Sequence, residues 1–481
     1  MTTTAWFEAV SERINPIVVK ELRQGLRTRV FWVCFTVLLL ACFLIALGAW
    51  AGSLDGRIGE SGQPFFFGFF ICLGAVQFFI IPYTAYRSLA REREEETWVL
   101  LSLTGLGARR VLRGKIGSYL AQAGLYASAV LPFLLFSYYL NGIDLPTILL
   151  VSALGFAWMI FLTCAAVCAA TLGESRIIRG LVHFAVLGTL LGAVATAWTV
   201  AGAIVFDGNS LWRDGPWVAA GVILWLMLSF GVLLFEAAAS QLALATEDTA
   251  RGPRLALVFQ VVGSAAILAW AWIESGRERE VAIASQLLLA AHLLFVGTFL
   301  VSAERKVHPS HAGRRFWPLL RPGPLSAFWL IVVLLGVVTA GALTLYIGSA
   351  NVGSRSAREL MMLVAAAAFA LLFLALPVVV THLVPIRTLS TPLGQRAVAF
   401  VVLTSACAVP PFTALVLGFE PEDRWINLFN PILGLLGYVG LPKQPDVPPE
   451  MKALVIVGSV AGVLSVWAER ILSKAERSSR A

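Results

Sequence analysis

The residues best suited to chemistry in this chain are few and widely separated. His308 and His311 lie in the motif HPSH and could begin a metal site, but no third ligand lies close to them in the sequence. Solvated loop residues are therefore the favoured interpretation. The single Gly-Lys pair, Gly114 and Lys115, is followed by Ile116 where a phosphate-binding loop requires Ser or Thr. The sequence therefore predicts a chain that is not itself an enzyme and holds neither a metal nor a cofactor.

The elements that must position these residues are apolar. Of 481 residues, 58% are hydrophobic and only 13% are charged, and the mean hydropathy is +0.82. A soluble domain carries about twice that share of charge. This composition excludes most soluble enzymes, nucleic-acid readers and disordered scaffolds, and it indicates an all-α integral membrane protein. The net charge of +8 is then interpreted as a record of membrane orientation, with no nucleic-acid partner.

Twelve apolar runs are long enough to cross a bilayer, for which a helix needs about 20 residues. We expect transmembrane helices at 30–51, 64–85, 117–140, 146–171, 180–206, 216–237, 254–273, 281–302, 325–347, 359–383, 397–419 and 451–469.

The distribution of basic residues predicts the orientation of these spans. With the N-terminus in the cytoplasm, 27 of the 36 Lys and Arg residues fall on the inner side, as the positive-inside rule requires. Both termini are therefore expected on the cytoplasmic side of the membrane. The apolar segment 426–440 has only 15 residues and contains Pro431 and three glycines. We expect it to be re-entrant or interfacial at the outer face.

The predicted spans contain few ionisable residues. Glu236 and Glu469 stand at the cytoplasmic ends of their spans, and His183 and His292 are the nearest to internal titratable groups. A lone histidine in a span is more often hydrogen-bonded to a neighbouring helix than part of a proton relay. Because a transporter driven by an ion gradient usually holds carboxylates at mid-membrane, we do not expect this chain to couple to ions.

Two predicted cytoplasmic segments say more about function than the spans do. Before the first span, apolar residues recur at helical spacing from Ile14 to Leu26, while Lys20, Arg23 and Arg27 face elsewhere. This pattern predicts an amphipathic helix on the inner leaflet, although a mere membrane anchor would have the same pattern.

The second element lies between the second and third spans, at 86–115. It begins with alternating charges from Arg91 to Glu96, becomes amphipathic around Trp98 and Leu101, and continues through glycines to a basic segment. Exposed apolar surface between charged ends usually meets a partner, so we expect a protein-docking role.

At these two elements the chain resembles the permease subunits of bacterial type-2 ABC transporters, whose N-termini read like NPIVVKELRQGLRTRVFW. In that family the loop after the second span has spaced acidic residues, Gly-Thr, a leucine-rich stretch, Thr-Pro and Gly-Lys. Here Glu96 replaces the usual Gly and Gly105 the usual Pro. The resemblance covers residues 10 to about 240, and it implies that the chain lies in the inner (cytoplasmic) membrane of a bacterium.

The resemblance implies that 1–29 is a connecting helix, that 30–240 is a six-span permease core, and that 92–104 is a coupling helix. The implied docking residues are Glu92, Glu94, Glu95, Thr97, Trp98, Leu100, Leu101 and Thr104. Those of the connecting helix are Lys20, Glu21, Leu22, Arg23 and Arg27. The implied partner is a separate ABC ATPase subunit that binds ATP and Mg²⁺, and a second copy or a second permease subunit would complete the exporter.

Residues 241–481 form a second six-span region without an equally clear signature. Phe328-Trp329 enters the ninth span as Phe31-Trp32 enters the first, so this half is either a degenerate repeat or a set of accessory spans. Two other functions stay open for the whole chain: a membrane scaffold or sensor that does not transport, and a lipid-modifying membrane enzyme. The substrate cannot be read from the sequence.

Overall fold

The computed structural model describes residues 16–54, 62–95, 107–173, 176–206, 214–243, 250–303, 318–349, 357–384, 386, 389, 391–418, 426–436 and 449–480. Within these ranges, twelve helices are long and apolar enough to cross a membrane. This confirms the all-α membrane fold and the twelve spans expected from the sequence. The chain divides into two compact units, Met1–Glu247 and Asp248–Ala481, and each is described by itself.

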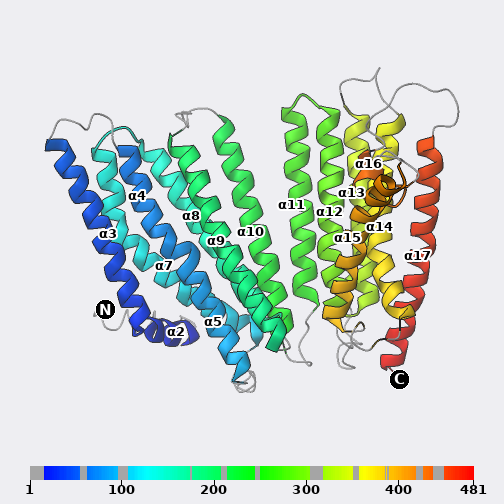
Figure 1. Cartoon of the computed structure of the whole chain (residues 1–481), viewed down its shortest axis with the longest axis horizontal. Coiled ribbons are helices and arrows are strands. Elements are labelled where there is room, and N and C mark those ends of the chain that lie inside the picture. The colour runs from blue at the N-terminus through cyan, green and yellow to red at the C-terminus, as the bar shows by residue number, and fades with distance from the viewer. Residues whose placement is uncertain are drawn as a thin grey trace, which may run out of the picture. The chain divides into compact units, whose positions relative to one another are not determined.

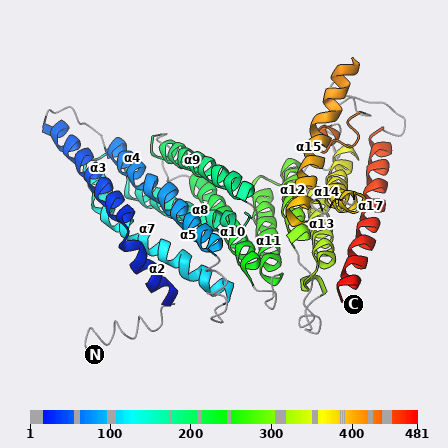
Figure 2. The ribbon, with the colours of Figure 1, turned by 60° about the horizontal axis from the view of Figure 1, so that its bottom comes forward.

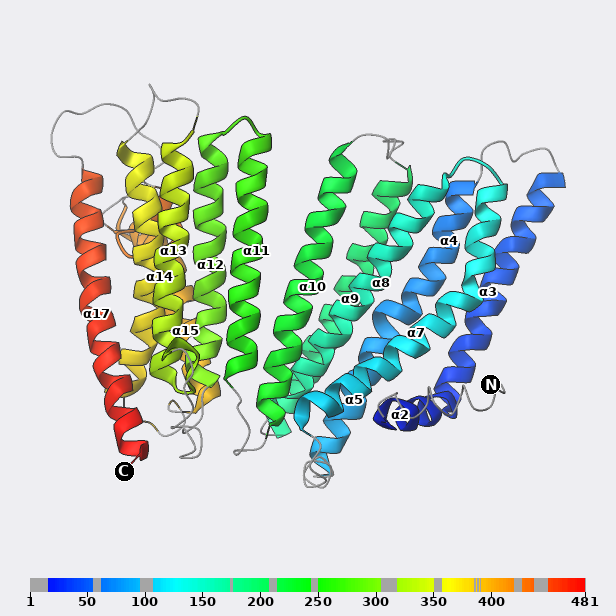
Figure 3. The same ribbon diagram turned by 180° about the vertical axis from the view of Figure 1, so that it is seen from behind.

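The first unit contains an interfacial helix and six membrane helices (Figure 1). These are α2 (Pro16–Leu26), α3 (Arg29–Leu54), the second span formed by α4 (Gly62–Gly74), η1 (Ala75–Ile80) and α5 (Ile81–Glu94), then α7 (Ala108–Tyr139), α8 (Leu145–Ala170), α9 (Arg176–Phe206) and α10 (Asp214–Leu242). Helix α2 lies across the ends of the spans, and Figure 3 shows it from behind. Helix α3 occupies one edge of this unit (Figure 2).

The turn between α2 and α3 is held by one threonine. The Thr28 hydroxyl donates to the Gly25 carbonyl at 2.7 Å and accepts from the Phe31 amide at 3.2 Å. The same side chain therefore satisfies a carbonyl at the end of α2 and an amide at the beginning of α3, as a capping residue does. This capping stabilises the change of direction from the membrane surface into the first span.

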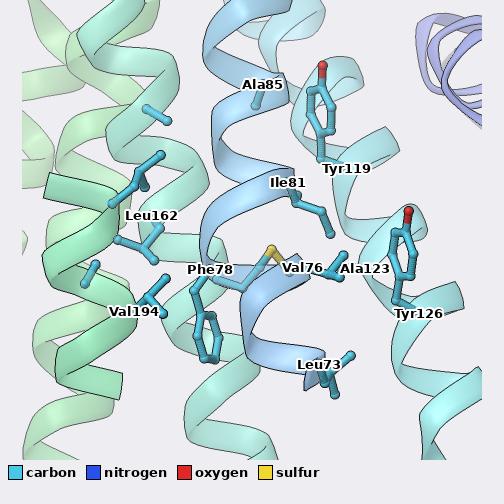
Figure 4. Close-up of a cluster of buried hydrophobic side chains, with 14 of the residues drawn as sticks. Leu73, Val76, Phe78, Ile81, Ala85, Tyr119, Ala123, Tyr126, Leu162 and Val194 are labelled. Atoms are coloured by element: carbon cyan, nitrogen blue, oxygen red, sulfur yellow. The ribbon is translucent and has the colours of Figure 1, made fainter. Parts of the chain in front are cut away.

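The second span contains a π-helical segment, η1, at its centre. Pro82 follows it and lacks the amide hydrogen that would bond to the Phe78 carbonyl. The Ile81 amide donates to the Val76 carbonyl, five residues earlier, which widens the turn. Figure 4 shows the side chains of this segment packed between α7 on one side and α8 and α9 on the other. The widened turn thus lies at the centre of the buried core of this unit.

The second unit contains six membrane helices: α11 (Arg251–Glu274), α12 (Arg279–Ala303), α13 (Pro324–Ile347), α14 (Ala357–Leu383), α15 (Pro392–Leu417) and α17 (Pro449–Arg480). Two short helices, η3 (Pro318–Leu320) and α16 (Leu433–Leu436), complete its described residues. Helix α14 is the central one and packs on α12, α13, α15 and α17. Helix α15 is the least covered, because among its residues only Ala414 is buried.

A buried arginine fixes the beginning of α13. Arg254, on α11, is fully buried, and its guanidinium donates to the carbonyls of Leu319, Arg321 and Gly323. An arginine can satisfy several carbonyls at once because it carries five N–H donors. Arg254 therefore has a structural role at the end of its span.

The outer surfaces of both units are apolar. Val33 and Leu44 on α3, Leu181 on α9 and Phe295 on α12 expose more than half of their side chains. Apolar bands of this extent would be untenable in water, and they are what a helix bundle presents to lipid.

Several helices are longer than the apolar runs that predicted them. The second span continues to Glu94, nine residues past its expected end, and α7 begins at Ala108, nine residues before. These extensions are charged, so hydropathy does not count them as membrane-spanning. Residues 86–94 and 108–115, the two ends of the expected 86–115 loop, are consequently helical.

Candidate functional site

A buried lysine joins three elements at one end of the first unit. Lys115, on the third turn of α7, exposes 2% of its side chain. Its ammonium lies 2.6 Å from a carboxylate oxygen of Glu92 and 3.3 Å from one of Glu21. It also donates to the Ser88 hydroxyl at 3.3 Å. We call Lys115, Glu21, Glu92 and Ser88 the Lys115 cluster.

Local sequence explains how the Lys115 cluster assembles. Ser88 and Glu92 are four residues apart on α5, so both face α7. On α2, the exposed residues Lys20, Arg23 and Gln24 alternate with the inward-facing Glu21. The cluster therefore receives its carboxylates from two different helices and its single cation from a third.

Glycines bring α2 close enough to α7 for this contact. A Cβ at Gly25 would lie 2.5 Å from the Gln122 side-chain nitrogen, and one at Gly117 would lie 3.3 Å from a methyl group of Val18. Ile17 is buried in the same contact. Small residues at helix contacts allow this close approach in membrane proteins.

Because its charges are poorly solvated, the Lys115 cluster is sensitive to displacement of the helices that carry it. Moving a charge out of water costs several kcal/mol unless a partner compensates for it. Here one ammonium is shared by two carboxylates that expose only 14% and 21% of their side chains. A displacement of α2 or α5 relative to α7 would separate these charges in a poorly solvated place, so the three helices are expected to move together.

Further polar contacts connect the same flanks to other helices. Arg109 on α7 lies 2.8 Å from Glu236 on α10, and Arg93 on α5 donates to the Ala170 carbonyl at the end of α8 at 2.9 Å. Glu94 lies 3.5 Å from Arg179 of α9. Exposed ion pairs of this kind add little stability, but together they define the position of α5 and α7 relative to α8, α9 and α10.

Two cavities lie on opposite sides of α5. One, of about 570 Å³, is lined by five arginines from α5 and α9 with His183 and Phe184. The other, of about 410 Å³, lies among α2, α5 and α7 and includes Glu21 and Glu92. Arg87 and Arg91 line both cavities.

The structure describes some of the site residues predicted from the sequence and not others. Glu92 and Glu94 lie in the last turn of α5, and Glu95 is its C-terminal cap. Thr97, Trp98, Leu100, Leu101 and Thr104 lie outside the described residues, as do His308 and His311. Lys20, Arg23 and Arg27 are exposed on or just after α2, whereas Glu21 and Leu22 face inward.

Sequence reasoning missed three partners in this region. Ser88 carried no signal in the sequence. For Glu236 the sequence indicated only a place at the cytoplasmic end of its span, whereas the structure pairs it with Arg109. Lys115 was noted only as part of a Gly-Lys pair. Its position two residues before the predicted third span, 117–140, was the available signal that its charge needs partners.

The described residues include no group of three or more potential metal ligands. The Lys115 cluster holds one ammonium between two carboxylates and so connects α2, α5 and α7 by charge. Comparisons of the chain with family models, with curated proteins and with solved structures found no match.

Proposed function

We propose that this chain is the membrane-spanning subunit of an ATP-driven exporter, and that a separate ABC ATPase docks on the segment between α5 and α7. The observation that carries the proposal is the Lys115 cluster. It connects α2, α5 and α7 beside the two ends of the segment that we expect to meet the ATPase.

Such a connection suits energy coupling. A partner that moves the segment 96–106 would displace the ends of α5 and α7 directly and α2 through the Lys115 cluster. Because α5 continues through η1 into α4, the displacement would reach the whole second span. Movement of packed helices between two arrangements is a recurrent way to alternate access across a membrane. In this proposal the segment and both termini lie in the cytoplasm.

Co-purification tests the proposal. The partner to be tested is an ABC ATPase with an intact phosphate-binding loop, taken from beside the gene for this chain where such a gene is present. Replacing Trp98 and Leu101 together by alanine should abolish its co-purification, because these are the apolar residues of the proposed docking helix.

Arg113→Gln is the matched control, since Arg113 is exposed on α7 and outside the Lys115 cluster. This variant should retain the ATPase. If the Trp98→Ala, Leu101→Ala variant inserts in the membrane and still binds the ATPase fully, the docking role is refuted. A chain that never binds an ATPase would instead support a scaffold or sensor.

A further inference from the structure

The second unit contains a groove that the proposed function does not use. Its volume is about 400 Å³, and α12, α14 and α15 form its walls. The lining is mainly alanine and phenylalanine, with Thr298 and Arg396 among the few polar residues. Ligand sites in proteins have this size and this character, apolar with a small number of polar groups. We call it the α15 groove.

One end of the α15 groove is closed by the segment 430–435, which α15 itself holds in place. Pro411 has no amide hydrogen, so the Cys407 carbonyl lacks its usual helix donor. The side-chain amide of Asn430 donates to that carbonyl at 3.0 Å, and its oxygen accepts from the amides of Ile432 and Leu433 at 3.0 and 3.1 Å. Asn430 is fully buried. This end of the groove is therefore a built structure and not a loose loop.

The other end of the α15 groove carries a positive charge. Arg396, near the beginning of α15, donates from Nε to the Ser302 hydroxyl at 3.0 Å. Its guanidinium carbon lies 5.1 Å from the ring centre of Phe299. Both partners are on α12, so the guanidinium is oriented across the groove mouth. Guanidinium groups bind phosphate and carboxylate with paired hydrogen bonds.

The length of the α15 groove matches one leaflet of a bilayer. Arg396 and Cys407 both line it and are eleven residues apart on α15, which corresponds to about 16 Å along a helix. Half of a hydrocarbon core of about 30 Å is nearly the same length. If Arg396 lies at the membrane interface, as its charge favours, a groove of this length reaches to about the midplane at Cys407.

We propose that the α15 groove binds one anionic phospholipid, with an acyl chain along α12, α14 and α15 and its phosphate at Arg396. The charge at the mouth selects an anionic headgroup, and the apolar walls accept a single chain. Because α15 is otherwise poorly covered, this lipid fills a gap in the packing of the unit. The site is independent of the ATPase proposed above.

Photocrosslinking of the full chain in liposomes tests the site. The probes are phosphatidylglycerol and phosphatidylcholine, each with a photoreactive group near the end of one acyl chain. We expect phosphatidylglycerol to label peptides that contain Leu403 and Phe369, which line the α15 groove, well above phosphatidylcholine. Arg396→Gln should lower this labelling roughly tenfold, the loss that corresponds to one charge-assisted hydrogen bond, and Arg396→Lys should retain part of it.

Two controls separate this site from ordinary lipid contact. Ala399→Trp fills the α15 groove and should abolish the labelling, whereas Val416→Trp, exposed on the same helix outside it, should not. Lys474→Gln removes an exposed charge on α17 and should change nothing. Equal labelling by both lipids, unaffected by Arg396→Gln in a chain that elutes as a folded protein, would show bulk lipid only and overturn the proposal. So would crosslinking data in which a second copy of the chain occupies the groove.

Discussion

At the scale of single residues, the strongest prediction concerns the contribution of the Lys115 charge to stability. Its two carboxylate partners are mostly buried, and removing one member of a buried ion pair costs about 3–5 kcal/mol. We expect Lys115→Met to lower the thermal unfolding midpoint of the detergent-solubilised chain sharply. The triple variant that adds Glu21→Gln and Glu92→Gln should recover most of this loss, because no uncompensated charge remains.

Arg113→Gln is the control for Lys115→Met, since an exposed substitution on the same helix shifts stability by about 0.5 kcal/mol or less. A Lys115→Met midpoint equal to that of the wild type would mean that the ammonium is solvated and the Lys115 cluster is not a structural link.

Gly323 offers a second test at this scale. Its φ is +135°, a conformation that residues with a Cβ rarely adopt, and a Cβ there would clash with a carboxylate oxygen of Glu476. Gly323→Ala should therefore destabilise the second unit in a thermal unfolding assay. Gly336→Ala, on α13 with open space around it, should be neutral. Equal effects of the two substitutions would contradict the strained geometry.

At the scale of elements, α15 and the segment after it depend on each other. Asn430→Ala leaves the Cys407 carbonyl without a donor and removes the acceptor at the beginning of α16, which should cost about 1–3 kcal/mol for each buried group left unsatisfied. Pro411→Ala restores an amide that can bond to the Cys407 carbonyl within α15. In a double-mutant cycle, Pro411→Ala should therefore be less damaging, or even stabilising, in the Asn430→Ala background.

The readout of that cycle is the unfolding midpoint of the four proteins in one detergent. Strictly additive effects of Asn430→Ala and Pro411→Ala would show that the two residues act independently and that Asn430 does not compensate for the proline.

The elements also show what the sequence could and could not predict. Runs of about 20 apolar residues predicted all twelve membrane helices, because the bilayer imposes that length. Hydropathy could not predict that α5 and α7 continue as charged helices, since their extensions leave the apolar core. Hydropathy also missed η1, because it does not register that Pro82 lacks the amide hydrogen for the Phe78 carbonyl.

The candidate site was predictable only in part, because its members come from helices that are far apart in the sequence. The helical period placed Lys20, Arg23 and Arg27 on one face of α2, and the structure exposes all three. Which carboxylates would reach Lys115 could not be read, because Glu21 and Glu92 are 71 positions apart and meet only through tertiary packing. The role of Asn430 could not be predicted either. Its partner is the Cys407 carbonyl, which Pro411 leaves without a helix donor and which is 23 positions away in the sequence.

At the scale of the whole molecule, the charge distribution predicts the topology. With both termini in the cytoplasm, a cysteine at position 474 near the end of α17 should be inaccessible to a membrane-impermeant maleimide in intact cells. A cysteine at position 278, in the turn between α11 and α12, should be labelled. The six native cysteines are first replaced by alanine. Labelling at 474 but not at 278 would invert the topology and place the 96–106 segment outside the cell.

The central claim is that this chain couples to ATP hydrolysis by a docked partner, and the rate of that hydrolysis tests it most directly. The ABC ATPase used in the co-purification experiment is assayed in liposomes alone, with the wild-type chain, and with the Trp98→Ala, Leu101→Ala variant. We predict a rate several times higher with the wild-type chain than with the ATPase alone, and a return to the lower rate with the variant. Equal rates in all three preparations, with the chain correctly inserted, would contradict the account.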